Sequence, residues 1–226
     1  MGDVRRIDLG YFVRPAEEAG AEHPRVEPVY GYLVRRPEGL LLFDTGMGAH
    51  PDVDAHYKPT RRPLRAALDK AGVSTDDVTM VVNCHLHFDH CGGNPEFATK
   101  PIVVQREELA TARTTTDYTL PELVDFAGAH YLEISGESEL WPGVWVIPTP
   151  GHTDGHQSVA VRRTDGTVVL AGQARDDATT YGRDVLAANE PGIPHPKWVE
   201  RLKELDPKAV VFAHDAAVWM PGERKD

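Results

Sequence analysis

The sequence predicts an α+β protein in which β-sheets are covered by helices on their outer faces. Apolar runs rich in β-branched residues recur along the chain between turn signals, which is the pattern of buried strands. Stretches with helical spacing of apolar residues lie between some of these runs. Strands and helices mixed in this order favour sheets with helices packed on the outside. No change of composition marks a boundary, so residues 1–226 are expected to form a single domain.

Eight runs are expected to be strands because each is short and apolar and is bounded by turn-forming or polar residues. In chain order they are residues 29–34, 40–43, 78–82, 102–104, 144–147, 158–161, 168–170 and 209–212. Three stretches are expected to be helices because each has helical spacing and opens with or near a proline or an acidic residue. They are residues 63–71, 106–113 and 196–205.

Two longer segments, 114–128 and 175–195, fit neither pattern and are expected to be loops, either at the surface or in substrate binding. The first carries four large apolar side chains that either line a substrate wall or pack in the core: Tyr118, Leu120, Leu123 and Phe126.

Composition narrows the possible partners. The formal net charge of −11 argues against nucleic acid, whose phosphates require a basic face. No apolar run approaches the roughly 18 residues of a membrane span, and the first residues lack a secretory signal, so a cytoplasmic protein is expected. Cys84 and Cys91 lie too close to the same motif to suggest a structural disulfide, and we expect reduced, packed thiols. The oligomeric state is left open.

The run HLHFDH at residues 85–90 is the most informative motif, because it supplies three imidazoles and one carboxylate directly after a predicted strand. His85 and His87 are two residues apart, so an extended backbone places both on one side, whereas Asp89 and His90 continue into a turn and face another way. This arrangement suits two adjacent metal positions. Imidazole and carboxylate are ligands that zinc, iron and manganese share.

Two further histidines follow predicted strands. His152 lies in TPGHTDGHQS, where Gly151 lets the backbone turn sharply, and His156 is expected to support it. His214 ends the apolar run AVVFA. The five remaining histidines are expected to be ordinary hydrogen-bonded or surface residues: His23, His50, His56, His130 and His195.

These three motifs, together with LLFDTG at residues 41–46, resemble the metallo-β-lactamase superfamily in order and spacing over almost the whole chain. The resemblance implies an αββα four-layer sandwich with metals at one edge. It also implies that one metal is held by His85, His87 and His152, and the other by Asp89, His90 and His214.

Within the superfamily, HLHFDHCGGN, GHTDGHQS and the late AHD are most similar to N-acyl homoserine lactonases and related small lactonases. Glyoxalase II relatives usually carry a C-terminal helical domain, but only about a dozen residues follow His214 here, and the basic arm of the long ribonucleases is also missing. Neither activity is therefore expected.

Gln173 departs from the family. It stands where the family places an aspartate that bridges the two metals, so it is a candidate ligand that brings an amide oxygen but no charge. We therefore expect the second metal to be held weakly or not at all. Asp176 stands where the lactonases tend to place a tyrosine near the substrate carbonyl.

The resemblance implies a metal-dependent hydrolase in which hydroxide on a bound zinc, with one or two ions present, opens an ester-type carbonyl. The expected substrate is a small molecule, a lactone such as an N-acyl homoserine lactone, with Asp89 orienting the water and passing its proton to the leaving alkoxide. Thioesters or β-lactams remain alternative substrates. Gln173 also keeps open a mononuclear iron-dependent oxygenase similar to the persulfide dioxygenases, and a non-catalytic metal-binding protein is a third alternative.

Overall fold

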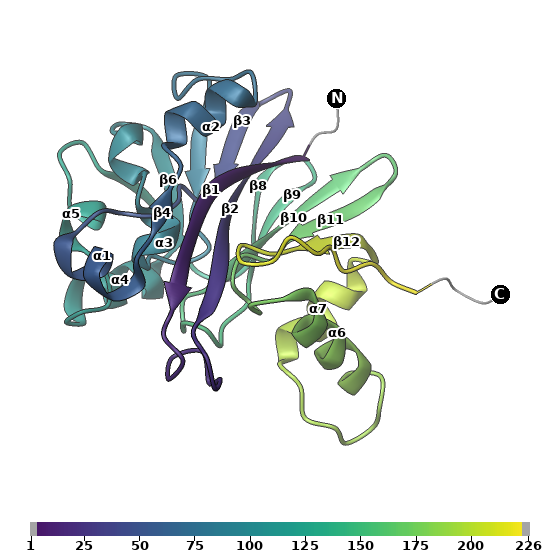
Figure 1. The fold of residues 1–226 in the computed structure, drawn as a ribbon. Helices are drawn as coiled ribbons and strands as arrows, with labels where there is room; N and C mark the ends of the chain where they lie inside the picture. The colour runs from purple at the N-terminus through teal and green to yellow at the C-terminus, as the bar shows by residue number, and fades with distance from the viewer. Residues whose placement is uncertain (1–3, 223–226) are drawn as a thin grey trace.

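The computed structural model describes residues 4–222, which fold into two β-sheets packed face to face with helices outside them (Figure 1). The first sheet has seven strands in the order β4-β1-β2-β3-β5-β6-β7, and the second has five in the order β12-β11-β10-β9-β8. The first comprises β1 (Val4–Arg14), β2 (Arg25–Arg36), β3 (Gly39–Phe43), β4 (Thr60–Arg61), β5 (Met80–Val82), β6 (Pro101–Gln105) and β7 (His130–Ile134). The second comprises β8 (Ser138–Trp141), β9 (Val144–Pro148), β10 (Gln157–Arg163), β11 (Gly166–Leu170) and β12 (Pro207–Val211).

The helices divide between the two outer faces. The first group lies on the seven-stranded sheet, and α6 and α7 lie on the five-stranded one (Figure 1). The first group is α1 (Pro51–Tyr57), α2 (Leu64–Lys70), α3 (Phe88–Cys91), the 3₁₀ turn η1 (Asn94–Phe97), α4 (Arg106–Thr114) and α5 (Pro121–Val124). The second is α6 (Ala178–Ala187) and α7 (Lys197–Glu204).

Three apolar clusters separate the four layers, because both faces of each sheet are buried. On β3, Leu42 packs toward the helices of the first sheet, while its neighbour Leu41 packs toward the second sheet. On β11, Val168 belongs to the layer between the sheets, while Val169 packs under α6 and α7. Alternate strand residues therefore serve different layers. The αββα sandwich is confirmed, and the shared central layer supports our proposal that residues 1–226 form one domain.

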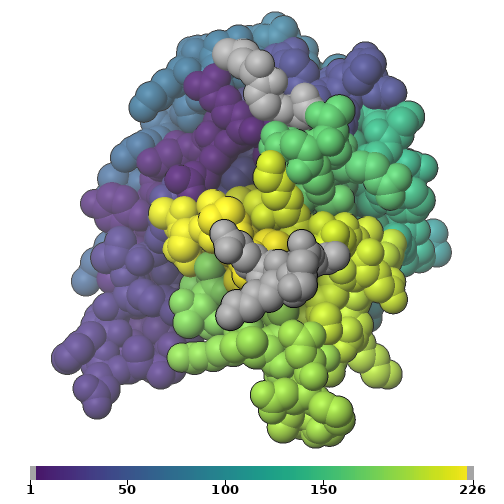
Figure 2. Space-filling model, turned by 90° about the vertical axis from the view of Figure 1, so that its right-hand side faces the viewer, coloured from purple at the N-terminus to yellow at the C-terminus, as the bar shows by residue number. Residues whose placement is uncertain are grey.

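Strand direction gathers the predicted site residues at one edge. β3, β5 and β6 are mutually parallel, and β11 is parallel to β12, whereas β9 is antiparallel to β10 and β10 to β11. The carboxyl ends of β9, β11 and β12 therefore share an edge of the second sheet. A main-chain hydrogen bond joins the two sheets at this edge, because Gln157 N donates to Cys84 O. The C-terminal segment also lies beside β1, where Arg6 donates to Ala216 O (Figure 2).

Each of the eight predicted strands overlaps a strand of the structure, and each of the three predicted helices overlaps a helix. The sequence pattern missed β1, whose VRRIDLGYFVR mixes charged and apolar residues irregularly and is buried on alternate positions over only part of its length. The expectation of loops was wrong for α5, which lies within 114–128, and for α6, which lies within 175–195. Asp177 caps α6 by accepting from Thr180 N at 2.7 Å.

Other expectations concern the chain as a whole. Cys84 and Cys91 are free and buried, which confirms the absence of a disulfide between them. Within residues 4–222, no helix has the length and apolar character needed to cross a membrane. The expectation of a missing secretory signal rests in part on residues 1–3, which lie outside the described residues.

Candidate metal centre

The HLHFDH run follows β5 and changes conformation along its length, from extended backbone at its start to a helical turn at its end. His87 has extended backbone angles (φ −69°, ψ 159°) and precedes α3, a single helical turn that contains Asp89 and His90. The two pairs therefore face different neighbours. His85 and His87 meet His152, which follows β9, while Asp89 and His90 meet His214, which follows β12.

Ligand atoms of the first triad lie close together. His152 Nε2 lies 3.2 Å from His87 Nδ1. The His85 ring lies 4.7 Å from that of His152 and 4.5 Å from that of His87, centroid to centroid. Among the described residues, His85 Nε2 is buried and has no hydrogen-bond partner. A buried lone pair without a partner is costly, and a metal ion is the partner that this arrangement accommodates.

The second triad is similarly compact. His90 Nε2 lies 3.1 Å from His214 Nε2, and Asp89 Oδ2 lies 3.3 Å from each of these nitrogens. Tetrahedral zinc with bonds of about 2.0–2.1 Å separates its ligand atoms by about 3.3 Å. The second triad therefore presents donor atoms at the spacing that a tetrahedral divalent cation requires. The ligand atoms of the first triad all lie within 4.8 Å of one another, and the residues of both triads are of the kinds that hold such a cation.

Gln173 lies beside the second triad, one turn beyond the end of β11. Its Oε1 is 3.2 Å from His90 Nε2, and its Nε2 donates to Asp176 Oδ1 at 3.1 Å. Its main-chain nitrogen donates to His156 Nε2 at 3.1 Å, while His156 Nδ1 is 2.8 Å from Thr149 Oγ1. His156 thus supports the site through the backbone of Gln173 rather than as a ligand.

Hydrogen bonds from behind fix the ring orientations of the second triad. Asp44 Oδ1 accepts from Cys84 N at 2.8 Å, and Asp44 Oδ2 accepts from His90 Nδ1 at 3.0 Å. His214 Nδ1 donates to the carbonyl of Pro28 at 2.8 Å. Because each Nδ1 is engaged in a hydrogen bond behind the site, each Nε2 faces the other members of the triad, in position for a ligand role. The LLFDTG turn therefore serves the site through Asp44, which orients His90.

Burial keeps the first triad neutral. Burial is the largest cause that lowers the pKa of His87 to about 4 and that of His152 to about 3, and it lowers the pKa of His85 well below its ordinary value. Near neutral pH these imidazoles are uncharged and able to donate a lone pair. Burial opposes ionisation of Asp89, but His90 and His214 hold its pKa well below the usual range, so this ligand is an anion.

The two triads open onto a cavity of about 450 Å³ whose lining includes His87, Asp89, His152 and Gln173. One wall is aromatic, where Tyr57 and Phe88 stack with centroids 5.0 Å apart and Phe12 meets both edge-on. The rest of the lining comes from α1 and the turn before it, from the ends of β1 and β2, and from residues 117–120.

The segment 114–128 divides between the two roles that the sequence left open. Tyr118 and Leu120 line the cavity and also pack against the core cluster beneath it. Leu123 is buried in α5, and Phe126 packs against the same core cluster. Two histidines expected to be ordinary, His50 and His56, also line the cavity.

Sequence reasoning missed Glu108, a buried carboxylate in the first turn of α4. It accepts from Leu86 N at 2.7 Å, from Thr153 Oγ1 at 2.8 Å and from the Tyr118 hydroxyl. Glu108 therefore joins the HLHFDH run, the loop that carries His152 and the cavity wall. The only signal was an acidic residue at a helix start, which does not distinguish it from the exposed Glu107.

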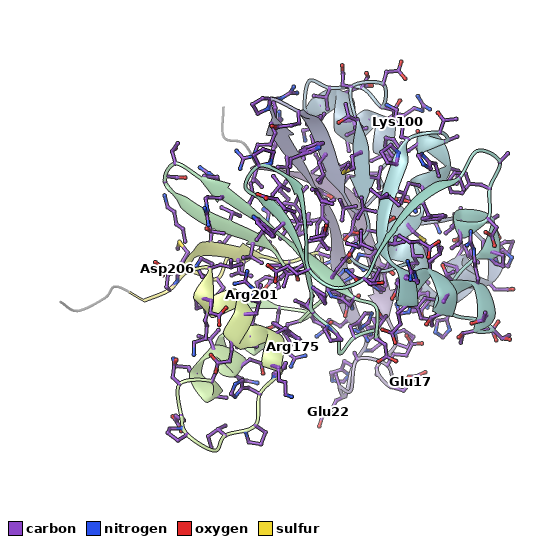
Figure 3. The ribbon with its side chains drawn as sticks, turned by 180° about the vertical axis from the view of Figure 1, so that it is seen from behind. Glu17, Glu22, Lys100, Arg175, Arg201 and Asp206 are labelled. Atoms are coloured by element: carbon purple, nitrogen blue, oxygen red, sulfur yellow. The ribbon has the colours of Figure 1, made fainter. Side chains whose placement is uncertain are left out.

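Sequence reasoning also missed an ionic cluster at the cavity rim. Arg14 ends β1 and Arg25 begins β2, so the two arginines flank the loop of this hairpin. Both contact the buried Glu27 and the carboxylate of Asp176. Figure 3 shows Glu17 and Glu22 at the tip of this hairpin and Arg175, next to Asp176, at the same end of the molecule. Burial would raise the pKa of Asp176, but hydrogen bonds from Arg25 and Gln173 and the two arginine charges lower it to about 2.

Comparisons with known proteins agree with this geometry. The sequence model of the metallo-beta-lactamase superfamily matches residues 24–214. An N-acyl homoserine lactonase from a Bacillus species is 33% identical over 205 residues, covering 83% of this chain and 81% of the relative.

Two solved structures have the same fold. A quorum-quenching N-acyl homoserine lactone hydrolase has a TM-score of 0.76 and 28% identity, covering 94% of this chain and 92% of its own. An N-acyl homoserine lactone hydrolase with the product N-hexanoyl-L-homoserine bound at its catalytic metal centre has a TM-score of 0.73 and 25% identity, covering 94% and 93%.

Proposed function

Because the chain belongs to the metallo-β-lactamase superfamily, we propose that it is a metal-dependent hydrolase that opens lactones such as N-acyl homoserine lactones. The observation that carries this proposal is the pair of compact ligand triads, each with its ligand atoms within 4.8 Å of one another, placed at a cavity large enough for a small molecule. The similar lactone hydrolases supply the reaction type.

His85, His87 and His152 would hold one divalent cation, and Asp89, His90 and His214 would hold a second, with the amide oxygen of Gln173 beside it. Zinc is the metal that this set of imidazoles and one carboxylate suits, although iron and manganese share such ligands. A divalent cation bound there supplies a Lewis acid for the carbonyl and lowers the pKa of a coordinated water.

Asp89 is the group of the chain placed to move the proton. Its carboxylate lines the cavity and is anionic, so it can accept the proton of the attacking water and return it to the leaving alkoxide. The aromatic wall of Phe12, Tyr57 and Phe88 excludes water from one side of the cavity and offers an apolar surface for an acyl chain.

The charges of the cavity favour an uncharged substrate over a carboxylate-bearing β-lactam. Outside the two triads, the lining carries Glu18, Glu27, Asp52 and Asp117. Among the described lining residues, Arg14 is the one arginine or lysine, and it is already paired with Glu27 and Asp176. These walls offer an anionic substrate little positive charge and would repel it, whereas a neutral lactone would meet no such repulsion.

A hydrolysis screen on the metal-loaded protein tests the proposal. We expect turnover of N-acyl homoserine lactones, little turnover of carboxylate-bearing β-lactams, and divalent metal in the purified protein by elemental analysis. Iron as the native metal, with oxygen consumed on a thiol substrate and lactones left intact, would instead establish the oxygenase alternative that the neutral Gln173 keeps open.

The two roles found within residues 114–128 give a paired prediction. Leu120→Ala removes part of the cavity wall, so the preference for long over short acyl chains, measured as a ratio of kcat/KM values, should fall by about tenfold. Leu123→Ala removes a core contact and should lower the free energy of unfolding by about 2–5 kcal/mol in a denaturant titration. The opposite pairing of effects would show that Leu123, not Leu120, contacts the substrate.

A further inference from the structure

The orientation of the Gln173 amide decides whether this residue can serve a cation at all. An amide presents an acceptor oxygen on one side and two donor hydrogens on the other, and only the oxygen can approach a metal ion. The oxygen faces the second triad, 3.2 Å from His90 Nε2, while Nε2 faces away toward Asp176. A rotation of the amide by half a turn would aim N–H groups at the cation.

Asp176 is placed to determine this orientation. Its Oδ1 accepts from Gln173 Nε2 at 3.1 Å, while its Oδ2 is held by Arg25 at 2.7 Å and by Arg14 at 3.3 Å. A carboxylate between two guanidinium groups is ionised and can only accept hydrogen bonds, so it binds the amide nitrogen and repels the amide oxygen. The neighbouring Asp177 is occupied at the start of α6, where it accepts from Thr180.

We propose that Asp176 is a positioning residue that holds the oxygen of Gln173 toward the second triad. In this way a fixed amide dipole serves at a position where the family resemblance implies a charged aspartate. The inference rests on the proposed function, because it requires a cation at the second triad. Arg14 and Arg25 take part in this positioning, since they hold Oδ2 of Asp176 and leave its Oδ1 for Gln173.

Asp176→Asn tests the proposal without creating a cavity. The arginines would attract the single oxygen of the new amide and turn its NH₂ group toward Gln173, which favours the wrong orientation of the Gln173 amide. In a titration with cobalt(II) followed by visible absorption, the second equivalent should bind about tenfold more weakly than in the wild type, and the first equivalent should be unchanged.

Asp165→Asn is the matched control. Asp165 is also an aspartate that contacts two basic side chains, Arg163 and Lys208, but it lies in the turn between β10 and β11, whereas Gln173 follows the opposite end of β11. Both equivalents should bind to this variant as they do to the wild type. A weaker second equivalent in the control as well would mean that Asp176→Asn acts only through the lost ion pairs and charge.

The Gln173→Asp background separates orientation from general electrostatics. A carboxylate has two equivalent oxygens, so it needs no orientation, and its repulsion with Asp176 is relieved when Asp176 becomes neutral. In this background Asp176→Asn should leave the second equivalent unchanged or tighten it. Equal weakening in both backgrounds, no weakening in either, or a wild type that binds no second equivalent at any cobalt concentration would overturn the proposal. Two cobalt ions bound without lactone hydrolysis would contradict the proposed function instead.

Discussion

Replacing His87 with alanine is expected to lower lactone hydrolysis by about 1,000-fold or more while leaving the fold in place. The loss follows from removing one of the three nitrogens of the first triad, since a Lewis-acid contribution of about 4 kcal/mol corresponds to a factor of about 1,000. The fold should persist because the His87 side chain makes no capping hydrogen bond to α3. Initial rates on a lactone, beside a far-ultraviolet circular dichroism spectrum, measure both halves.

His130→Ala is the control for this substitution. His130 is exposed at the start of β7 and belongs to neither triad, so hydrolysis should be unchanged. Near-normal turnover in His87→Ala, with metal content preserved, would end the interpretation of this motif as a hydrolytic metal centre.

The isosteric change Asp89→Asn should lower kcat by at least about 100-fold. Asp89 contributes the negative charge of the second triad, with Oδ2 at 3.3 Å from both His90 Nε2 and His214 Nε2, and an amide there can neither balance a cation nor accept the water's proton. Metal content should fall from its wild-type value at the second position only. Steady-state kinetics and elemental analysis on the same samples give the measurement.

Asp117→Asn removes a negative charge from the same cavity without touching a triad. Asp117 has a positive φ of 61°, a conformation that asparagine also tolerates, so the backbone should be unaffected. On a neutral lactone we expect its kcat to stay within about twofold of the wild type, since Asp117 is exposed and belongs to neither triad. If both variants lost activity equally, the effect of Asp89→Asn would reflect cavity charge rather than its place in the second triad.

Local patterns predicted much of the fold because the strands concerned are buried on both faces. Val168–Leu170 and Leu40–Phe43 read as continuous apolar runs, since alternate residues serve different core layers. β1 carries arginines and an aspartate among its apolar residues, and α6 follows a run of polar residues, so neither was visible locally. Their stability comes from partners outside each segment, such as the pairing of β1 with β2 and the packing of Tyr181 against Trp198.

The sequence by itself determined which residues are candidate metal ligands, because strand ends, a two-residue spacing and a helical turn are local features that fix where side chains point. Only the tertiary structure decided how that set is held. Glu108 joins three loops, Asp44 orients His90, and the arginines of the β1–β2 hairpin fix Asp176 and, through it, the Gln173 amide. Arg25 and Asp176 are 151 residues apart in the chain, and a hydrogen bond across such a separation depends on the packing of whole sheets rather than on any pattern near either residue.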